Sequence, residues 1–161
     1  AKTAGNYAAC NLAEKQAQAQ GFTQVLWLDA VERKYIEEVG SMNIFFVIDD
    51  EIVTPQLNGT ILPGITRKSV LELARHWDLK TSERRISIDE VLEGLESGRV
   101  SEVFGAGTAA VISPVGLLHY RGQSYQVGDG QTGPVAKRFF EHLTAIQYGQ
   151  ENDPFGWVET V

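Results

Sequence analysis

The chain has 161 residues and a mass of 17.7 kDa, a length that suits one domain with a sizeable hydrophobic core. Hydrophobic residues make up 43% of it and charged residues 22%, which is near the average of globular domains and argues against disorder. Because 14 Lys and Arg stand against 21 Asp and Glu, with a net charge of -7, we expect no nucleic acid and no anionic membrane as partners.

The hydrophobic pattern predicts four helices, each with apolar positions three and four residues apart on one face. The third helix opens with a capping box, in which the Ser87 hydroxyl accepts from the Glu90 amide and the Glu90 carboxylate reaches back. The expected helices run from Tyr7 to Gln20, from about Thr66 to Trp77, from Ile88 to about Gly98, and from Pro134 to just before Gly149.

Short apolar runs bounded by turn residues predict strands between these helices. Turns at Asp49–Asp50 and Arg121–Gly122 join pairs of them into hairpins, Thr81–Ile86 is expected as an extended link, and Gly105–Thr108 as a corner. This mixture predicts an α+β fold rather than a doubly wound sheet. The expected strands are Gln24–Leu28, Met42–Ile48, Glu51–Thr54, Glu102–Phe104, Ala109–Ile112, Leu117–Tyr120 and Ser124–Val127.

The sequence restricts the cellular setting and the metal chemistry. One cysteine, Cys10, allows neither an internal disulfide nor a thiolate zinc cluster, so we predict no metal site and a cytoplasmic location. No run approaches the roughly 20 apolar residues of a membrane span. The first residue is Ala1 rather than a methionine and opens in the middle of a pattern, so we expect the chain to be cut from a longer protein.

Two side-chain features can carry chemistry. Lys2 precedes a turn, and a lysine acts as a nucleophile only where its surroundings keep the amine neutral; otherwise it is a solvated terminal residue. Glu37 and Glu38 precede the apolar run at Met42, and a carboxylate entering a buried sheet needs a partner such as a protonated ring nitrogen or an arginine. The alternative is a pair of exposed turn glutamates.

Two backbone features can bind anions. Leu62–Arg67 lies at a predicted helix start, where free amides and the helix dipole favour an anion, although many helices start this way without one. Gly105–Ala109 can present amides and the Thr108 hydroxyl to a phosphate or carboxylate, or can be a flexible sheet corner. An amine, an acid and two anion cradles together are what a pyridoxal-phosphate enzyme requires.

Six motifs in this order resemble the large domain of the branched-chain amino-acid aminotransferases, which are fold-type-IV enzymes that use pyridoxal 5'-phosphate. The resemblance covers essentially all 161 residues and implies a cofactor-binding large (C-terminal) domain over residues 1–161, truncated at its N-terminus and without the N-terminal small domain. The motifs are Lys2-Thr-Ala-Gly-Asn-Tyr7, Gln24-Val-Leu-Trp-Leu-Asp29, Glu38-Val-Gly-Ser-Met-Asn43, Leu57-Asn-Gly-Thr-Ile-Leu-Pro-Gly64, Glu102-Val-Phe-Gly-Ala-Gly-Thr-Ala109 and Ile146-Gln-Tyr-Gly149.

The resemblance also implies roles for the cofactor site. Lys2 matches the lysine that bonds the cofactor covalently and then moves the proton between the substrate Cα and the cofactor C4'. Tyr7 matches the tyrosine that binds the phenolic oxygen, and Glu38 matches the acid that pairs with the pyridinium nitrogen. The amides of Ile65 and Thr66 match those that hold the phosphate.

The same comparison of motifs places the substrate. Thr108 adds a hydroxyl to the phosphate site, and Ser41 with the Thr108-Ala109 amides matches the positions that orient the substrate carboxylate. The implied reaction transfers the amino group of leucine, isoleucine or valine to 2-oxoglutarate, giving glutamate, in a homodimer. Three alternatives stay open: a fragment without its own catalysis, structural or cofactor-binding; a D-amino-acid aminotransferase; and an aminodeoxychorismate lyase.

Overall fold

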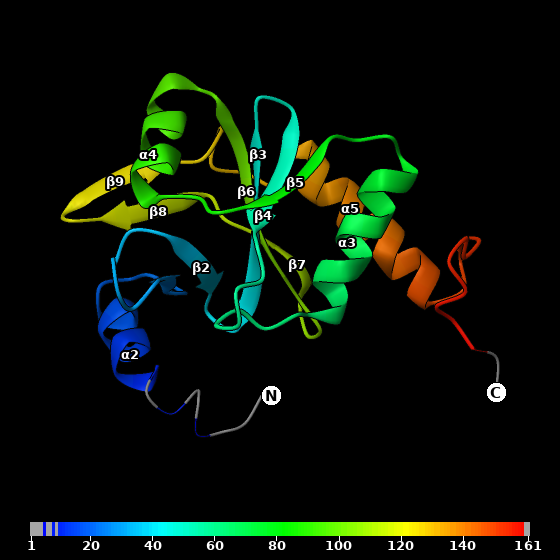
Figure 1. Ribbon diagram of the computed structural model, residues 1–161, viewed down its shortest axis with the longest axis horizontal. Helices are drawn as coiled ribbons and strands as arrows, with labels where there is room; N and C mark the ends of the chain where they lie inside the picture. Colours follow the sequence, from blue (N-terminus) through cyan, green and yellow to red (C-terminus); the bar gives the residue numbers. More distant parts are fainter. Residues whose placement is uncertain (1–4, 6–7, 9, 160–161) are drawn as a thin grey trace.

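The computed structural model describes residues 5, 8 and 10–159, so the expectations for Lys2 and Tyr7 lie outside the described residues. The described part of the chain contains four helices and nine strands (Figure 1). In chain order they are α2 (Asn11–Ala19), β1 (Leu26–Leu28), β2 (Ile36–Val39), β3 (Met42–Ile48), β4 (Glu51–Pro55), α3 (Ile65–His76), β5 (Thr81–Arg84), α4 (Ile88–Ser97), β6 (Val100–Gly107), β7 (Val111–Pro114), β8 (Leu117–Tyr120), β9 (Gln123–Gln126) and α5 (Pro134–Gln147).

Strand β3 is the centre of a seven-stranded sheet. It pairs with β6 along one edge, and β2 and β4 share its other edge one after the other. All pairs in this sheet are antiparallel except β4–β5, which is parallel and connected through α3. Strands β8 and β9 form a separate hairpin. The α+β prediction is confirmed.

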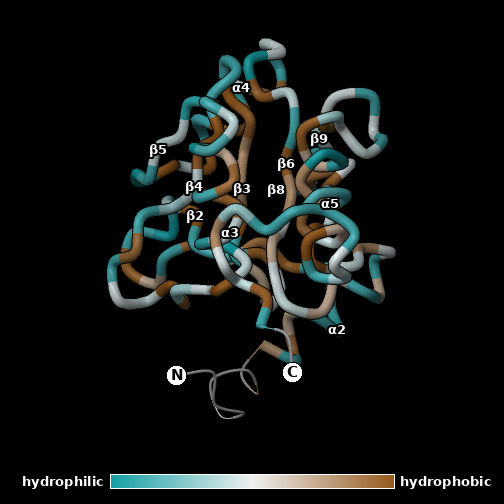
Figure 2. Tube along the Cα trace, turned by 90° about the vertical axis from the view of Figure 1, so that its right-hand side faces the viewer, coloured by the Kyte–Doolittle hydropathy of each residue, from teal (hydrophilic) through white to brown (hydrophobic). Residues whose placement is uncertain are grey.

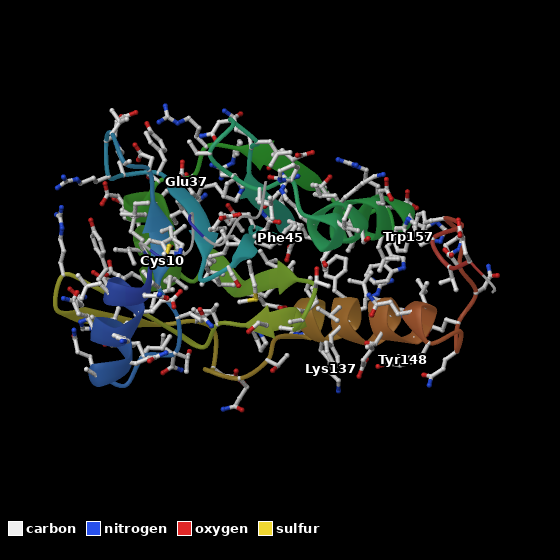
Figure 3. The ribbon with its side chains drawn as sticks, turned by 90° about the horizontal axis from the view of Figure 1, so that it is seen from below. Cys10, Glu37, Phe45, Lys137, Tyr148 and Trp157 are labelled. Carbon is white, nitrogen blue, oxygen red and sulfur yellow. The ribbon has the colours of Figure 1, made fainter. Side chains whose placement is uncertain are left out.

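Both faces of the sheet are covered, which explains why β3 is apolar along nearly its whole length. Ile44 and Phe46 point into a core with α4 and the β8–β9 hairpin, whereas Phe45 and Val47 point into a second core with α3 and α5. Figure 1 shows these two layers on opposite sides of the sheet, and in Figure 2 the hydrophobic segments gather along the central strands. In Figure 3, Phe45 lies inside the second core.

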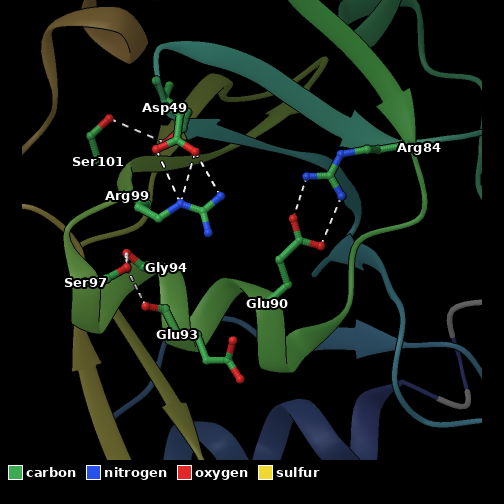
Figure 4. Close-up of polar contacts among 9 residues, drawn as sticks. Asp49, Arg84, Glu90, Glu93, Gly94, Ser97, Arg99 and Ser101 are labelled. Atoms are coloured by element: carbon green, nitrogen blue, oxygen red, sulfur yellow. Dashed lines mark hydrogen bonds and ion pairs between the residues drawn. The ribbon is translucent and has the colours of Figure 1, made fainter.

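The start of α4 confirms half of the predicted capping box. Ser87 Oγ accepts a hydrogen bond from the Glu90 amide at 3.1 Å. The Glu90 carboxylate does not reach back as expected; it binds both terminal nitrogens of Arg84, at 3.0 and 2.5 Å (Figure 4). A two-bond ion pair with a guanidinium is stronger than one bond to a backbone amide, so the arginine of β5 takes the carboxylate.

Several expectations about the strands were wrong. Thr81–Arg84 is not a link but strand β5, paired with β4, and β2 was not expected. The glycines of Gly105–Thr108 form no corner, because β6 continues to Gly107 and β7 begins only at Val111. A Cβ at Gly107 would lie 2.9 Å from Met42 Cγ, so the glycine allows the Met42 side chain to cross β6 closely.

Two further features can be stated for the described residues. No helix among them is long and apolar enough to cross a membrane. No three or more of their His, Cys, Asp and Glu side chains form a group that could hold a metal ion.

Candidate functional site

The sheet register brings two predicted site segments into one row, with Asn43 between them. Glu38 of β2 lies opposite Asn43 of β3, and Asn43 lies opposite Ala106 of β6. Residues that are directly opposite in antiparallel strands point to the same face. Asn43 alternates with Ile44 and so shares the face of Phe45, the face that α3 and α5 cover. Glu38 therefore points to the α3 side of the sheet.

The two neighbouring glutamates have different partners. Glu38 is half-buried, and its Oε1 accepts hydrogen bonds from Asn43 Nδ2 at 3.2 Å and from the Leu62 amide at 3.3 Å. Glu37 Oε1 accepts from Thr60 Oγ1 at 2.5 Å in an exposed contact. Both carboxylates therefore contact the segment preceding α3, and Glu38 is the one bonded to the backbone nearest the helix start and to Asn43.

Asn43 was not among the predicted site residues. It is only 4% exposed, and its Nδ2 donates to the Leu62 carbonyl at 2.8 Å in addition to Glu38. A Cβ on Gly64 would overlap with Asn43 Oδ1, so the residue before α3 must be a glycine to pack there. The sequence signal that could have identified Asn43 is its polar side chain in an otherwise apolar strand. A polar side chain that is buried needs hydrogen-bond partners nearby.

Helix α3 presents its positive end at this place. It begins at Ile65, one residue before the expected Thr66, after an extended Gly64 that gives no side-chain cap. The bond from the Lys68 amide to the Gly64 carbonyl, 3.1 Å long, is the first of the helix, so the amides of residues 65–67 have no partner within it. Thr66 is half-buried and Ile65 is exposed. The arrangement suits an anion.

Two turns lie together at the same end of the sheet. Gly40 and Ser41 connect β2 to β3, and residues 108–110 connect β6 to β7; Ser41 is two residues from Asn43, and Thr108 is two residues from Ala106. At the strand rise of about 3.3 Å per residue, that is within roughly 7 Å along the strands. Ser41, Thr108 and Ala109 are exposed there. The register thus brings together both predicted carboxylate-binding segments.

The described residues of this region offer a half-buried carboxylate, free helix amides and exposed hydroxyls, the groups needed to bind a molecule that is cationic at one position and anionic at others. The structure also contains a cavity of about 540 Å³, but on the opposite face of the sheet, between α2, β1 and the β7–β8 segment. Val39 and Met42 line that cavity, whereas Glu38, Thr66 and Thr108 do not. The predicted site is therefore distinct from it.

Comparison with known sequences identifies relatives over almost the whole chain. The model of the family described as amino-transferase class IV matches residues 1–118. A protein of Bacillus subtilis named branched-chain-amino-acid aminotransferase 2 is 56% identical over 161 residues, which are 100% of this chain and 44% of that protein. A probable branched-chain-amino-acid aminotransferase of Staphylococcus aureus is 54% identical over 157 residues, 98% of this chain and 44% of that protein.

Solved structures with the same fold come from the same group of enzymes. A branched-chain amino acid aminotransferase from Escherichia coli superposes with a TM-score of 0.82 at 34% identity, covering 99% of this chain and 50% of that one. Another, from T.th., complexed with N-(5'-phosphopyridoxyl)-L-glutamate, gives a TM-score of 0.83 at 33% identity, also covering 99% and 50%.

These matches show the fold of the chain and how much of each relative the chain covers. The fold is that of the fold-type-IV aminotransferases, and the chain spans less than half the length of the curated relatives it matches. The family model covers well over half of the 161 residues. It includes Glu38, the start of α3 and both turns, so the chain belongs to the class IV aminotransferases.

Proposed function

We propose that residues 1–161 are the cofactor-binding large domain of a branched-chain amino-acid aminotransferase. The reaction transfers the amino group of leucine, isoleucine or valine to 2-oxoglutarate, giving glutamate and the branched 2-oxo acid. The observation that carries the proposal is the meeting of Glu38, the start of α3 and the two turns at one end of the sheet. The names of the relatives, at 54–56% identity, support the choice of substrates.

Pyridoxal 5'-phosphate fits the groups found at this site. The ligands of two structures of the T.th. enzyme, N-(5'-phosphopyridoxyl)-L-glutamate and pyridoxamine 5'-phosphate, support its assignment as the cofactor. Its phosphate suits the amides of Ile65 and Thr66 with the Thr108 hydroxyl, which explains how a chain of net charge -7 can hold a dianion. Its ring nitrogen, when protonated, suits the Glu38 carboxylate. When bound, the cofactor supplies an electron sink for the Cα of the amino acid.

The residues of this chain bind, orient and move a proton. Glu38 holds a proton on the ring nitrogen by its negative charge. Ser41 and the Thr108-Ala109 turn orient the substrate carboxylate. Lys2 bonds the cofactor and moves the proton at the substrate Cα, and Tyr7 donates to the phenolic oxygen; the resemblance supports these two assignments, which lie outside the described residues.

We also propose an oligomeric state and a cellular location for the protein. The family resemblance supports a homodimer, whose test is the mass of the protein in sedimentation equilibrium. The single cysteine is compatible with the reducing cytoplasm as its location.

Transamination by the purified chain tests the function directly. We expect turnover of L-leucine, L-isoleucine and L-valine with 2-oxoglutarate, and a loss of at least about 100-fold in Glu38→Gln, because the oriented charge that pairs with the ring nitrogen is removed. Glu37→Gln is the matched control and retains the activity. Turnover confined to D-amino acids would instead assign a D-amino-acid aminotransferase. Release of pyruvate from aminodeoxychorismate would assign an aminodeoxychorismate lyase.

A second candidate function follows from the length of the relatives. Because the chain covers 44% of them, it can be a cofactor-binding unit without its own catalysis. Pyridoxamine 5'-phosphate binding without any turnover would support this candidate. Reduction of the cofactor complex with borohydride, followed by peptide mapping, is expected to label Lys2; label on another lysine would contradict the assignment of the catalytic residue.

A further inference from the structure

We infer that Asn43 is a positioning residue that connects the Glu38 carboxylate to the first turn of α3. Through this connection the positions of the carboxylate and of the amides that face the phosphate are coupled. The inference rests on the proposed function, since it assigns Glu38 to the cofactor ring and the α3 amides to its phosphate. Asn43 itself contacts neither in this assignment; it acts through the groups that do.

The hydrogen bonds of Asn43 form a closed triangle. The Nδ2 amino group has two hydrogens and uses both, one on Glu38 Oε1 at 3.2 Å and one on the Leu62 carbonyl at 2.8 Å. The Leu62 amide closes the triangle by donating to the same Glu38 oxygen at 3.3 Å. A displacement of the carboxylate therefore strains bonds to both β3 and the segment before α3.

The triangle continues into the helix. The Leu62 carbonyl also accepts from the Gly64 amide at 2.9 Å, and Gly64 is the residue directly before the first turn of α3. Its Cα packs so closely against Asn43 Oδ1 that a side chain there would overlap with it. Asn43 thus holds the helix start from two sides, by a bond through Leu62 and by contact with Gly64.

Burial makes the arrangement depend on Asn43. The residue is 4% exposed, so solvent does not reach its amide in the folded chain. Loss of a buried partner leaves polar groups short of a hydrogen bond, here the Leu62 carbonyl and the Glu38 carboxylate, and the segment must then shift to reach water. A shift of that segment displaces Gly64 and the amides that follow it, as well as the carboxylate.

The coupling between two partial ligands measures this connection. Pyridoxamine carries the ring without the phosphate, and inorganic phosphate carries the anion without the ring. If the ring site at Glu38 and the phosphate site at the α3 amides are coupled, phosphate raises the affinity of the chain for pyridoxamine. Pyridoxamine then raises the affinity for phosphate by the same factor. We expect a factor of about five or more, at the lower limit of typical allosteric couplings.

Substitutions separate positioning from stability. In Asn43→Ala we expect this coupling factor to fall to about one, and the affinity for pyridoxamine 5'-phosphate to fall by about 10- to 100-fold, as for other residues that orient a ligand-binding group. Thr54→Val is the matched control. Thr54 is 0% exposed and donates to the Ile44 carbonyl at 2.7 Å, so this variant also loses one buried bond to a backbone carbonyl, at the residue next to Asn43, but none of the bonds to Glu38 or Leu62. It lowers stability but keeps the coupling.

A measurement on the unsubstituted chain covers the case in which Asn43→Ala does not fold. Pyridoxamine alone is expected to slow amide hydrogen exchange from Leu62 to Thr66 although it has no phosphate; protection limited to β2 would contradict the inference. Partial ligands that bind without coupling, or an intact coupling in Asn43→Ala, would overturn it while the proposed function stands. A chain that binds none of the three ligands would overturn both.

Discussion

The indole Nε1 of Trp27 donates a hydrogen bond to the Gly40 carbonyl at 2.9 Å, so strand β1 holds the turn that carries Ser41. The Gly40 amide donates to the Val25 carbonyl at 2.8 Å, so both backbone groups of this glycine are bonded to β1 or its approach. Gly40 has a φ of 55°, and a Cβ there would overlap with the Gln24 side chain. The turn therefore depends on both a glycine and a tryptophan.

Replacing Trp27 by phenylalanine should loosen this turn. The variant keeps an aromatic ring but loses the bond to Gly40, and we expect a loss of about 1 kcal/mol in the free energy of unfolding, measured with urea. Because the proposal assigns Ser41 to the substrate carboxylate, KM for leucine should rise more than kcat falls. Trp77→Phe is the control, since the Trp77 ring packs on Phe139, with ring centroids 5.1 Å apart, at the C-terminal end of α3 and not at the turn. Equal effects on KM in both variants would contradict the role of Trp27.

Arg67 should be far more important for stability than its neighbour Arg75. Arg67 is 4% exposed, and its Nη2 donates to Glu83 at 2.7 Å and to the Pro55 carbonyl at 2.9 Å, which joins α3 to β4 and β5. Arg75 reaches the same Glu83 at 3.3 Å but has an exposed side chain. We expect Arg67→Ala to cost about 2 kcal/mol, because it removes a buried side chain and leaves the Pro55 carbonyl without this donor, whereas water replaces part of the contact with the more exposed Glu83.

The exposed pair provides the control for that experiment. Arg75→Ala should cost less than about 1 kcal/mol, since exposed ion pairs are screened by water and lose side-chain freedom when they form. Urea unfolding of both variants under the same conditions measures the difference. Similar losses in the two would show that burial at Arg67 does not control the strength of the contact with Glu83.

The sequence predicted the elements whose signals are local. The apolar run Met42–Ile48 has the length of a strand and bounds that the structure confirms, and the Ser87 cap of α4 needed only residues three positions apart. Strand β5 was taken as a link because its residues Thr81–Arg84 are polar; it forms by parallel pairing with β4, which lies before α3 in the chain. No local pattern contains that pairing.

The site was predicted in the same uneven way. Glu38 and the α3 start were found from motifs, but the partner that joins them, Asn43, was identified only as a member of a motif. Its role depends on Leu62, 19 residues later, and on the exclusion of a side chain at Gly64. Likewise, Gly105–Thr108 was expected as a corner because the close contact of Gly107 with Met42 joins β6 and β3, which are neighbours in the sheet but distant in the sequence.

Glu102 should stabilise the start of α5 although it belongs to a strand. Its carboxylate is buried, with 6% of the residue exposed, and accepts from the amides of Val135 and Ala136, both at 2.8 Å. These amides have no partner within the helix, and a carboxylate also suits its positive end. We expect Glu102→Ala to cost about 2 kcal/mol, in the range for hydrogen bonds to a charged group.

The amide variant and a surface variant complete that experiment. Glu102→Gln keeps one acceptor oxygen but turns an amino group toward one of the two amides, so it should also destabilise, by about 1 kcal/mol or more. Glu93→Gln, an exposed position on α4, should change the free energy of unfolding by less than about 0.5 kcal/mol. If Glu102→Gln matched Glu93→Gln in urea unfolding, the carboxylate would not be what holds the start of α5.

Asp29 should make stability depend on pH below 4. Backbone amides of Tyr35, Lys34 and Glu32 donate to its carboxylate and hold its pKa well below the usual value of 3.8. Since the ionised form is favoured in the folded state, its contribution is fully present above the unfolded pKa and is lost as the pH falls toward the folded pKa. Asp29→Asn cannot ionise and accepts through one oxygen only, so it should be less stable than the unchanged chain at pH 7.

The difference in the free energy of unfolding between the unchanged chain and Asp29→Asn should then become smaller as the pH is lowered from about 4 to 2. Protonation of Asp29 removes the stabilisation that its charge gives the unchanged chain, and the variant never had this charge. Urea midpoints at pH 7, 5, 4, 3 and 2 measure it, with the exposed Asp78→Asn as the control for the loss of one surface charge. A difference that stays constant over this range would mean that the turn is held by packing of its backbone and not by the charge on Asp29.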